Sequence, residues 1–496
     1  MPKKILFFLD LFTLHFALAD YLQKNTDYEL YALVDVTDNP KSFFQNQKIV
    51  NFKKTWYYHD NIEMKKSHID IEYLKNFEIK YNLNIKQLIN NDRFFKKYND
   101  YYNFTNSEIN SILTQEGKLF EKIISDCKPD FLIMFQPSLR HEYFFYEVCK
   151  QNNVKPLIIN PSLMGYKSFI SEQINFLDEM NIEKENSTNK TFNDLQSYYN
   201  KNNINHQIID YVENFAKSKL SLMNAAIEFL FFSQNSNVKT HYTYAGRTKL
   251  RVFFKTFKNK ISKKLRENFI KDNLESKIPE KNSIYFPLQV EPDRNLLLGA
   301  PNFTNQIDSI KQISQSLPPN YTLCVKEHPG QNREWRDISF YKKIMEIPHV
   351  VLLKPEVPSS ELYKKSSMVI TAVGTSGFEA LFYGKPVIVF NDTLYSVLPS
   401  VKKMVSFETL PNLIKNNLDI EVTPQPLEKL LSYLEKNSFN FDLFGYYTMQ
   451  AHEFFHDSNL IDVKISEQKM KEFLEKNKMS YKMIGEEIIK KIHNYS

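Results

Sequence analysis

The sequence has few cysteines, and none of its apolar runs is long. Its three cysteines, Cys127, Cys149 and Cys324, are far apart in apolar surroundings, which excludes a disulfide framework and a cysteine metal cluster. No uninterrupted apolar run approaches the roughly 20 residues that a membrane-spanning helix needs. Internal repeats and long low-complexity segments are also missing from the sequence. We therefore expect a globular protein of the reducing cytoplasm.

The charge balance is only mildly basic. The net charge is +6 at pH 7, which permits contact with anionic substrates or lipid surfaces but does not indicate a nucleic-acid partner. At 496 residues the chain is longer than a single hydrophobic core usually holds, so we expect two domains.

The N-terminal stretch imitates a secretory signal peptide. Two lysines precede an apolar run, and residues 17–19 (Ala-Leu-Ala) resemble a cleavage site. Asp10 and His15 interrupt the run, however, and a second strand-like segment at 30–36 follows at the spacing of a βαβ unit. We therefore expect a first strand at Lys4–Leu9, a loop at Asp10 and then a helix.

The first half of the chain has the pattern of an α/β domain with insertions. Further short apolar runs predict strands at 30–36, 131–135 and 157–159. A helix is predicted at 106–127, where Lys-Pro-Asp separates it from the next strand. The polar, Asn-rich stretch 163–205 is expected to be a surface excursion.

Residues 321–392 alternate short apolar runs with helical segments, which predicts a parallel sheet. Two polar clusters follow strands in this region. They are Lys326-Glu327-His328-Pro329 and Gly374-Thr375-Ser376-Gly377. Because ligands bind at the carboxyl ends of parallel strands, both clusters should face one crevice.

The residue types of the two clusters suit a nucleotide. Ser376 and Gly377 are predicted to begin a helix, whose free N–H groups favour an anion. Lys326 adds a positive charge, His328 adds a hydrogen-bond donor, and Glu379 can accept hydrogen bonds from ribose hydroxyls. The alternative is that the second cluster only caps a helix and His328 is an ordinary loop residue.

The loop after the strand near 283 adds two further candidates. Gln289 and Glu291 are within predicted reach of the donor or of the base, between Pro287 and Pro292, which stiffen the loop. A purely structural turn between domains is the alternative.

The segment KEHP followed by GTSGFEALFYGKPVIVF resembles the nucleotide-binding half of GT-B glycosyltransferases of bacterial capsule and surface-polysaccharide biosynthesis. FPLQVEPD, at 286–293, looks like that family's strand and interdomain loop. The resemblance covers 283–392 well and the N-terminal half in outline. It implies two Rossmann-like domains facing a central cleft, a nucleotide-sugar donor and a polysaccharide or glycolipid acceptor.

Other families share parts of these motifs. The HP and Ser/Thr pair is similar to that of sialyl- and polysialyltransferases, which use CMP-sugars such as CMP-sialic acid, and to that of CDP-glycerol glycerophosphotransferases. The latter typically carry an acid before the second motif, which residues 371–374 lack. GTSG-x-E with G-K-P-V is similar to UDP-N-acetylglucosamine 2-epimerases, which would not need the long N-terminal insertions or a basic helix. We favour a CMP-linked acidic sugar such as Kdo or sialic acid over a UDP-sugar.

The reaction needs a base for the acceptor hydroxyl, which we expect from strand ends of the first domain. Asp10, His15, His141 and Glu142 qualify by position, and Glu142 is expected close to Arg140. Glu142 could instead be an ordinary helix-start acid, and with retention of configuration the carboxylates would serve as nucleophile. The chain contains no D-x-D triplet, so we expect no metal, and we expect no cofactor.

Residues 247–271 form a separate feature. Basic residues crowd this stretch, and apolar residues recur at steps of three and four, which predicts an amphipathic helix with a basic face. Such a helix can bind an anionic membrane surface, as a peripheral protein on the inner face of the membrane would. Alternatively it packs on the protein and keeps its basic face in water.

These features divide the chain into four parts. We predict an N-terminal Rossmann-like domain at 1–240, a basic linker at 241–282, a C-terminal Rossmann-like domain at 283–400, and a helical segment at 401–496 that returns toward the first domain.

Overall fold

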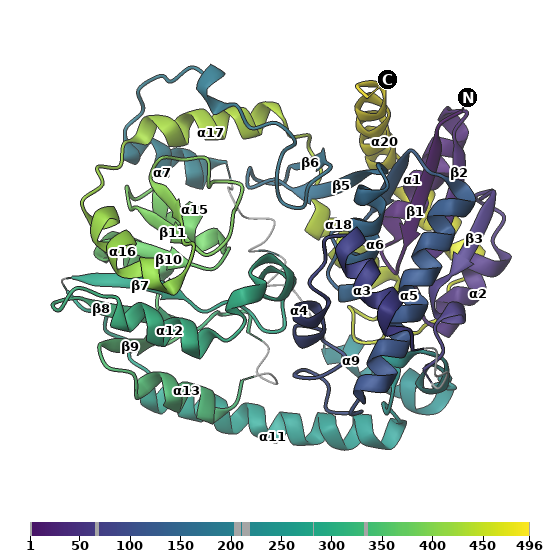
Figure 1. The fold of residues 1–496 in the computed structure, drawn as a ribbon, viewed down its shortest axis with the longest axis horizontal. Coiled ribbons are helices and arrows are strands. Elements are labelled where there is room, and N and C mark those ends of the chain that lie inside the picture. Colours follow the sequence, from purple (N-terminus) through teal and green to yellow (C-terminus); the bar gives the residue numbers. More distant parts are fainter. Residues whose placement is uncertain are drawn as a thin grey trace.

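The computed structural model describes residues 2–64, 69–202, 210, 219–280, 282–331 and 336–495. Two α/β domains, each built on a six-stranded sheet, lie side by side, with the second domain at the left in Figure 1. A long helix, α11 (Lys249–Asn273), runs along the lower edge of both. Both chain ends belong to the first domain.

The first sheet has the strand order β3-β2-β1-β4-β5-β6 and is parallel except for the last pair. Its strands are β1 Lys4–Leu9, β2 Glu29–Val34, β3 Lys54–Tyr57, β4 Phe131–Met134, β5 Lys155–Pro161 and β6 Ser168–Ser171. β1 is buried along most of its length, as expected for a central parallel strand covered on both faces. The predicted strand at Lys4–Leu9 is thus confirmed as the centre of this sheet.

The second sheet has the order β12-β11-β10-β7-β8-β9 and is parallel throughout. Its strands are β7 Ser283–Pro287, β8 Thr322–Lys326, β9 Val350–Leu353, β10 Met368–Thr371, β11 Val387–Val389 and β12 Val401–Lys403. Helices cover both sheets on both faces (Figure 1). The predicted fold of two Rossmann-like domains with a helical C-terminus is confirmed.

The helices follow the strands in alternation. Those before α11 are α1 Thr13–Asn25, α2 Asp38–Asn46, α3 Ile71–Lys80, α4 Ile85–Asn90, α5 Asn106–Cys127, α6 Arg140–Gln151, α7 Phe192–Lys201, α9 Lys219–Ile227 and α10 Asn237–Thr240. Those after it are α12 Gln306–Gln315, α13 Ile338–Met345, α14 Ser359–Lys365, α15 Thr375–Leu381, α16 Leu410–Leu418, α17 Pro424–Lys436, α18 Leu443–Phe454, α19 Glu467–Lys476 and α20 Lys478–His493. Short 3₁₀ or π turns are η1 Tyr58–Asn61, η2 Ile182–Lys184, η3 Glu228–Phe232, η4 Tyr242–Tyr244, η5 Asn295–Gly299, η6 Pro301–Phe303 and η7 Phe407–Thr409.

α5 shows how local sequence sets an element's limits. Thr105 accepts a hydrogen bond from the backbone N–H of Glu108, and the Glu108 carboxylate accepts one from the N–H of Thr105, which completes a capping box. At the other end Lys128 adopts a left-handed conformation before Pro129, so the helix stops where the sequence predicted.

The C-terminal helices divide between the two domains. α16 and α17 contribute Leu410 and Leu430 to cores of the second domain, and β12 pairs with β11, so this domain extends past the predicted boundary at residue 400. α18, α19 and α20 return to the first domain, where Ile484 and Ile488 share a core with α1. The return therefore begins near Phe439, which pairs with Ser168.

The Asn-rich stretch 163–205 differs from its predicted character. Leu163, Met164, Leu177 and Leu195 are buried in a core of the second domain, against α17 and α15. The prediction of a surface excursion is wrong for these residues, because their apolar side chains are too widely spaced among polar ones to give a periodic signal. Residues 203–209 lie outside the described part of the chain.

The structure also bears on the cysteines and on membrane insertion. All three cysteines are buried and free. Among the described residues, no helix combines the length and the apolar character needed to cross a bilayer.

Replacing Gly485 with alanine tests the docking of α20. The added methyl group would overlap the ring of Tyr21 on α1, so we expect Gly485→Ala to destabilise the protein by about 1–3 kcal/mol. Urea unfolding measures this change. Met479→Ala, at a site 72% exposed on the same helix, is the control and should be neutral. Equal stability of both variants would contradict the tight α1–α20 contact.

Candidate functional site

Acidic and imidazole side chains gather at the carboxyl ends of the first sheet. Asp10 follows β1, Asp35 follows β2, His59 follows β3, and His141 and Glu142 begin α6 after β4. Ligand atoms of Asp35, His141 and Glu142 lie within 4.8 Å of one another. The parallel order of the strands brings these residues together although they are far apart in the sequence.

Asp35 is the centre of this group. Its carboxylate contacts Nε2 of His141 at 2.8 Å and Nε2 of His59 at 3.0 Å. Burial alone would raise the pKa of Asp35, but the two imidazoles outweigh it and hold the pKa below its usual range. Burial likewise opposes charge on His141, yet Asp35 raises its pKa overall, and its ring stacks on Tyr58 at 4.7 Å between centroids.

Asp10 and Glu142 are the carboxyls of this group without a cationic partner among the ion pairs of the described residues. Asp10 accepts a 2.7 Å hydrogen bond from the N–H of Phe12. Burial, then the charge of Glu142, raises the pKa of Asp10 to about 7. Glu142 accepts hydrogen bonds from the N–H groups of Ser138 at 2.6 Å and Leu139 at 2.9 Å, and burial raises its pKa.

Arg140 has other ion-pair partners than the one that the sequence predicted. Its guanidinium contacts Glu116 in a bidentate pair at 2.5 and 2.8 Å and Asp92 at 2.8 Å, all in the interior. The expected pairing of Arg140 with Glu142 is wrong, because two more deeply buried carboxylates need the charge.

His15 also has a different environment from the one expected. It is fully buried beside Phe12 and Phe135, and neither ring nitrogen has a hydrogen-bond partner among the described residues. Burial lowers the pKa of His15 to about 3. A neutral imidazole enclosed by aromatic rings does not reach an acceptor, so His15 is a core residue.

The cluster Lys326 to Pro329 lies at the end of β8, as predicted. Lys326 is buried and donates to Oγ of Ser359 at 2.8 Å, and burial lowers its pKa. The N–H of Gly330 donates to Nδ1 of His328 at 3.0 Å, so this nitrogen carries no proton. Burial lowers the pKa of His328, which leaves a neutral ring whose Nε2–H can donate; Pro329 beside it is exposed.

The cluster Gly374 to Gly377 follows β10. The hydroxyl of Tyr395 donates to the carbonyl of Gly374 at 2.5 Å, and a side chain at Gly377 would collide with this hydroxyl. Thr375 begins α15, a helix of seven residues, and Thr375 and Ser376 are partly exposed. Glu379 accepts a 2.9 Å hydrogen bond from Tyr363.

Arg336, which the sequence did not single out, occupies the middle of a buried polar network. It contacts Glu327 and lies 3.7 Å from Glu291. Glu327 also accepts from Tyr341 at 2.7 Å, and Glu291 accepts from Gln306 at 2.6 Å. Both acids are therefore bound within this buried network, and a role for them in direct donor binding stays a prediction.

The loop 289–294 joins the two strand-end groups. The side-chain amide of Gln289 donates to Oγ1 of Thr371 at 3.3 Å. The backbone N–H of Gln289 donates to Oε1 of Gln306. Arg294 donates from Nε to the carbonyl of Pro137, in the first domain, at 3.0 Å. Arg336 donates to the carbonyl of Gln289 and also contacts Glu327, which connects the loop to the end of β8. The loop thus has the acid cluster on one side and the KEHP cluster on the other.

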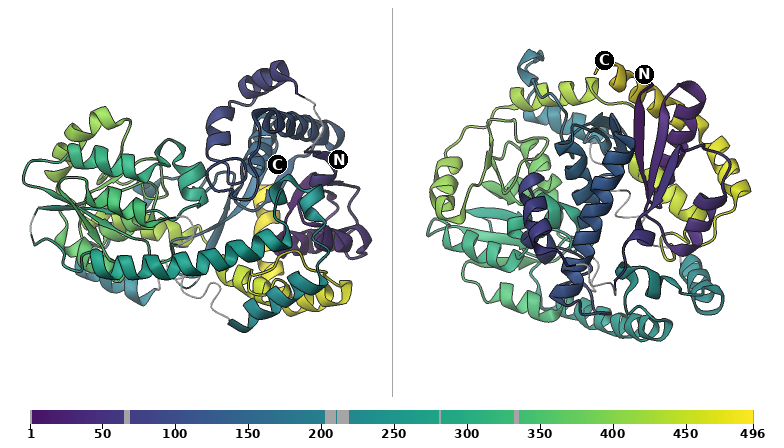
Figure 2. Two further views of the ribbon diagram at one scale, coloured as in Figure 1. Left: turned by 90° about the horizontal axis from the view of Figure 1, so that it is seen from below. Right: turned by 45° about the vertical axis from the view of Figure 1, so that its right-hand side comes forward.

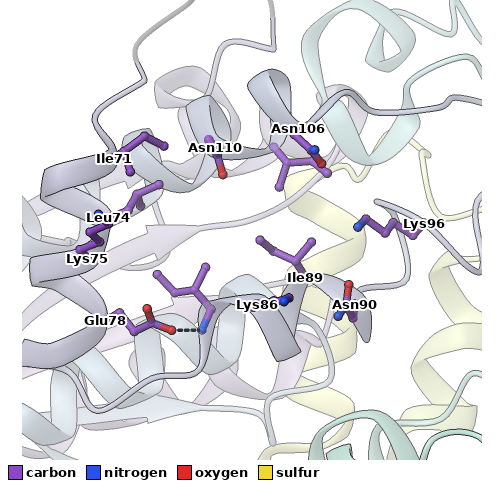
Figure 3. Close-up of a pocket in the computed structure, with 12 residues that line it drawn as sticks. Ile71, Leu74, Lys75, Glu78, Lys86, Ile89, Asn90, Lys96, Asn106 and Asn110 are labelled. Atoms are coloured by element: carbon purple, nitrogen blue, oxygen red, sulfur yellow. Dashed lines mark hydrogen bonds between the residues drawn. The ribbon is translucent and has the colours of Figure 1, made fainter.

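A separate pocket of about 450 Å³ lies between α3, α4 and α5 of the first domain (Figure 3). Ile71, Leu74 and Ile89 point into it, and Lys75 and Lys86 lie at its rim. Residues predicted for the site do not line this pocket. The pocket is lined mainly by residues of α3, α4 and α5 and not by residues at the strand ends.

Comparison with protein families bears on the second domain. Residues 195–399 match the model of the family "Capsule polysaccharide biosynthesis protein". The match contains both predicted donor clusters and α11. It supports the predicted relationship to proteins of capsule polysaccharide biosynthesis for this part of the chain. No curated protein matches the chain in sequence.

Several solved structures match the chain at low identity and low TM-score. A UDP-GlcNAc 2-epimerase from Methanocaldococcus jannaschii is 12% identical, with 88% of this chain and 100% of that chain covered and a TM-score of 0.27. The Thermosulfurimonas dismutans KpsC β-Kdo 2,7-transferase is 13% identical, with 63% and 79% covered and a TM-score of 0.30. A glycosyltransferase from Rickettsia africae is 11% identical, with 97% and 98% covered and a TM-score of 0.26. At these scores the likenesses carry no argument about the activity.

The raised pKa of Asp10 predicts a specific pH dependence. The folded protein holds a proton on Asp10 that the unfolded chain releases above 3.8, so its stability falls as the pH rises from there to about 7. Asp10→Asn removes this loss and keeps an acceptor for Phe12. We expect the melting temperature of the variant, relative to the original protein, to rise between pH 4 and pH 7. A constant difference over this range would contradict the raised pKa.

Proposed function

We propose that this chain, a glycosyltransferase of the capsule polysaccharide type with GT-B architecture, moves a sugar from a nucleotide-activated donor to a surface polysaccharide or glycolipid. The donor nucleotide binds at the strand ends of the second domain, and the acceptor binds against the first. A CMP-linked acidic sugar, such as CMP-Kdo or CMP-sialic acid, is the preferred donor, and a UDP-sugar is the alternative.

The observation that carries this proposal is the position of the loop 289–294. It contacts the first domain through Arg294, and Arg336 connects it to the KEHP cluster by binding both the carbonyl of Gln289 and the carboxylate of Glu327, so the acid group and the donor group lie on its two sides. A transferase needs this arrangement, because the base and the leaving group act on opposite sides of the transferred sugar in an inverting displacement.

On the donor side, the side chains suit a departing phosphate. Lys326 supplies a positive charge at the floor of the crevice, and the neutral His328 supplies an Nε2–H donor. Both stabilise negative charge as the bond between the anomeric carbon and the phosphate oxygen breaks and its electron pair stays with the phosphate.

On the acceptor side, Asp10 is our first choice as the base. A carboxyl with a pKa of about 7 is half ionised at neutral pH and can take the proton of an acceptor hydroxyl, whose oxygen then bonds to the anomeric carbon. Glu142 keeps the pKa of Asp10 high by its charge and is the second candidate. His141 is held by Asp35, which suits a positioning role in the same group.

The donor site is tested by thermal shift with CMP, CDP, UDP, UMP and GDP. We expect stabilisation by CMP, and we expect His328→Ala to weaken the affinity on the order of 10- to 100-fold because a donor to a charged phosphate is lost. His493→Ala, at an exposed position, is the control and should leave binding unchanged.

The outcomes separate the alternative functions. Stabilisation by UDP rather than CMP would favour a UDP-sugar donor, and isomerisation of a UDP-sugar without acceptor would show an epimerase instead. Stabilisation by CDP and transfer from CDP-glycerol would indicate a glycerophosphotransferase. No response to any of the five nucleotides would refute the donor site.

The base is tested by turnover. Asp10→Asn should lower kcat by about 10²- to 10⁴-fold while nucleotide binding stays unchanged, because only the proton transfer is lost. Asp419→Asn, at an exposed position, is the matched control. If Asp10→Asn keeps full turnover and Glu142→Gln loses it, the role of base passes to Glu142.

A further inference from the structure

The apolar side of α11 is exposed rather than packed against the part of the protein that the structure describes. Its buried residues are Arg266 and Ile270, near its C-terminal end. The apolar residues of the stripe are instead between 51% and 72% exposed. They are Leu250, Phe253, Phe254, Phe257, Ile261 and Leu265. The packed alternative that the sequence left open is therefore wrong for this stripe.

Basic residues flank this stripe on both sides. Within Lys249–Asn273 nine residues are basic and two, Glu267 and Asp272, are acidic. At 3.6 residues per turn, Lys258 lies on one flank of the stripe and Lys260 and Lys264 lie on the other, and all three are exposed. Lysines at such positions can extend their charged ends past an apolar surface.

A second exposed apolar segment joins the N-terminal end of α11. In η3, Phe231 is 76% and Phe232 is 75% exposed, and Leu222 and Met223 of α9 are exposed as well. Nζ of Lys249 donates to the carbonyl of Leu230 at 2.9 Å, which ties this segment to the first turn of α11. We call these two adjoining exposed segments together the α9–α11 face.

The α9–α11 face spans both domains. Near its start, Nη1 of Arg251 donates to the carbonyl of Tyr101 in the first domain at 3.0 Å. Near its end, Arg266 donates to the carbonyl of Arg336 in the second domain. Figure 2, seen from below, shows the helix crossing from one domain to the other along the outside of the molecule.

We propose that the α9–α11 face docks the protein on an anionic lipid bilayer, with α11 lying in the plane of the interface. The aromatic and aliphatic side chains enter the boundary between headgroups and acyl chains, and the flanking lysines contact anionic headgroups. The combination of an exposed apolar stripe with positive charge on both flanks favours this occupant, because its charge complements the lipid. Membrane docking through this face is independent of which nucleotide the donor site binds.

Vesicle co-sedimentation tests the proposal with the full chain. Vesicles of phosphatidylcholine with 30% phosphatidylglycerol should bind the protein, and vesicles of phosphatidylcholine alone should bind it far less. The triple change Lys258→Gln, Lys260→Gln and Lys264→Gln should lower the partition coefficient on the order of a hundredfold, since each basic residue contributes roughly fivefold. Phe231→Ser with Phe232→Ser, and separately Phe253→Ser with Phe257→Ser, should each lower it as well.

Matched changes outside this face are the controls. Lys471→Gln, Lys478→Gln and Lys482→Gln remove three exposed lysines of α19 and α20, and Ile79→Ser and Val405→Ser remove side chains 80% and 85% exposed. These variants should bind vesicles like the unchanged protein, and every variant should keep its thermal shift with nucleotide.

Three results would overturn the proposal. They are absence of vesicle binding by the unchanged protein, equal binding to neutral and anionic vesicles, and a stable dimer in sedimentation velocity that Phe253→Ser with Phe257→Ser dissociates. The last result would assign the face to a second copy of the chain. Loss of nucleotide binding with intact vesicle binding would concern only the donor site.

Discussion

Parallel strand pairing constrains where chemistry can take place in this molecule. Because parallel strands all point the same way, their carboxyl ends meet at one edge of each sheet. Asp10, Asp35 and His141 follow three neighbouring strands of the first sheet, and Lys326 and Gly374 follow two strands flanking β7 in the second. The order and direction of the strands therefore bring the candidate site residues together, and no single contact is needed to explain their position.

Buried charged groups of the first domain differ in whether they have a partner of opposite charge. Arg140 is bound by Glu116 and Asp92, and Asp35 is bound by two imidazoles, so these charges are neutralised locally. Burial raises the pKa of both Asp10 and Glu142, and the charge of Glu142 adds to the effect on Asp10. The same sheet edge therefore holds a carboxylate that stays ionised and carboxyls that bind protons more readily.

Strand and helix positions were readable from local patterns, whereas charge pairing was not. The strand Lys4–Leu9 and the helix 106–127 follow from apolar runs, stop signals and a capping box, all of which act within a few residues. The partners of Arg140, Glu116 and Asp92, are 24 and 48 residues away in the sequence, and no local pattern encodes such contacts. Arg336 is next to the KEHP cluster in the sequence, but its burial shows only once β7, β8 and α13 are assembled. The apolar stripe of α11 was predicted, and its exposure required the three-dimensional packing.

The return of α18–α20 to the first domain has a consequence for synthesis. Ile484, Ile488 and Ile492 fill the core beside α1, and residues 163–195 complete a core of the second domain. Neither domain can close its interior from a continuous piece of chain. On the ribosome, the first domain keeps part of its apolar interior open until α20 has been added, and a fragment cut between the sheets would leave both pieces incomplete. The two halves of this protein are separate in architecture but must mature together.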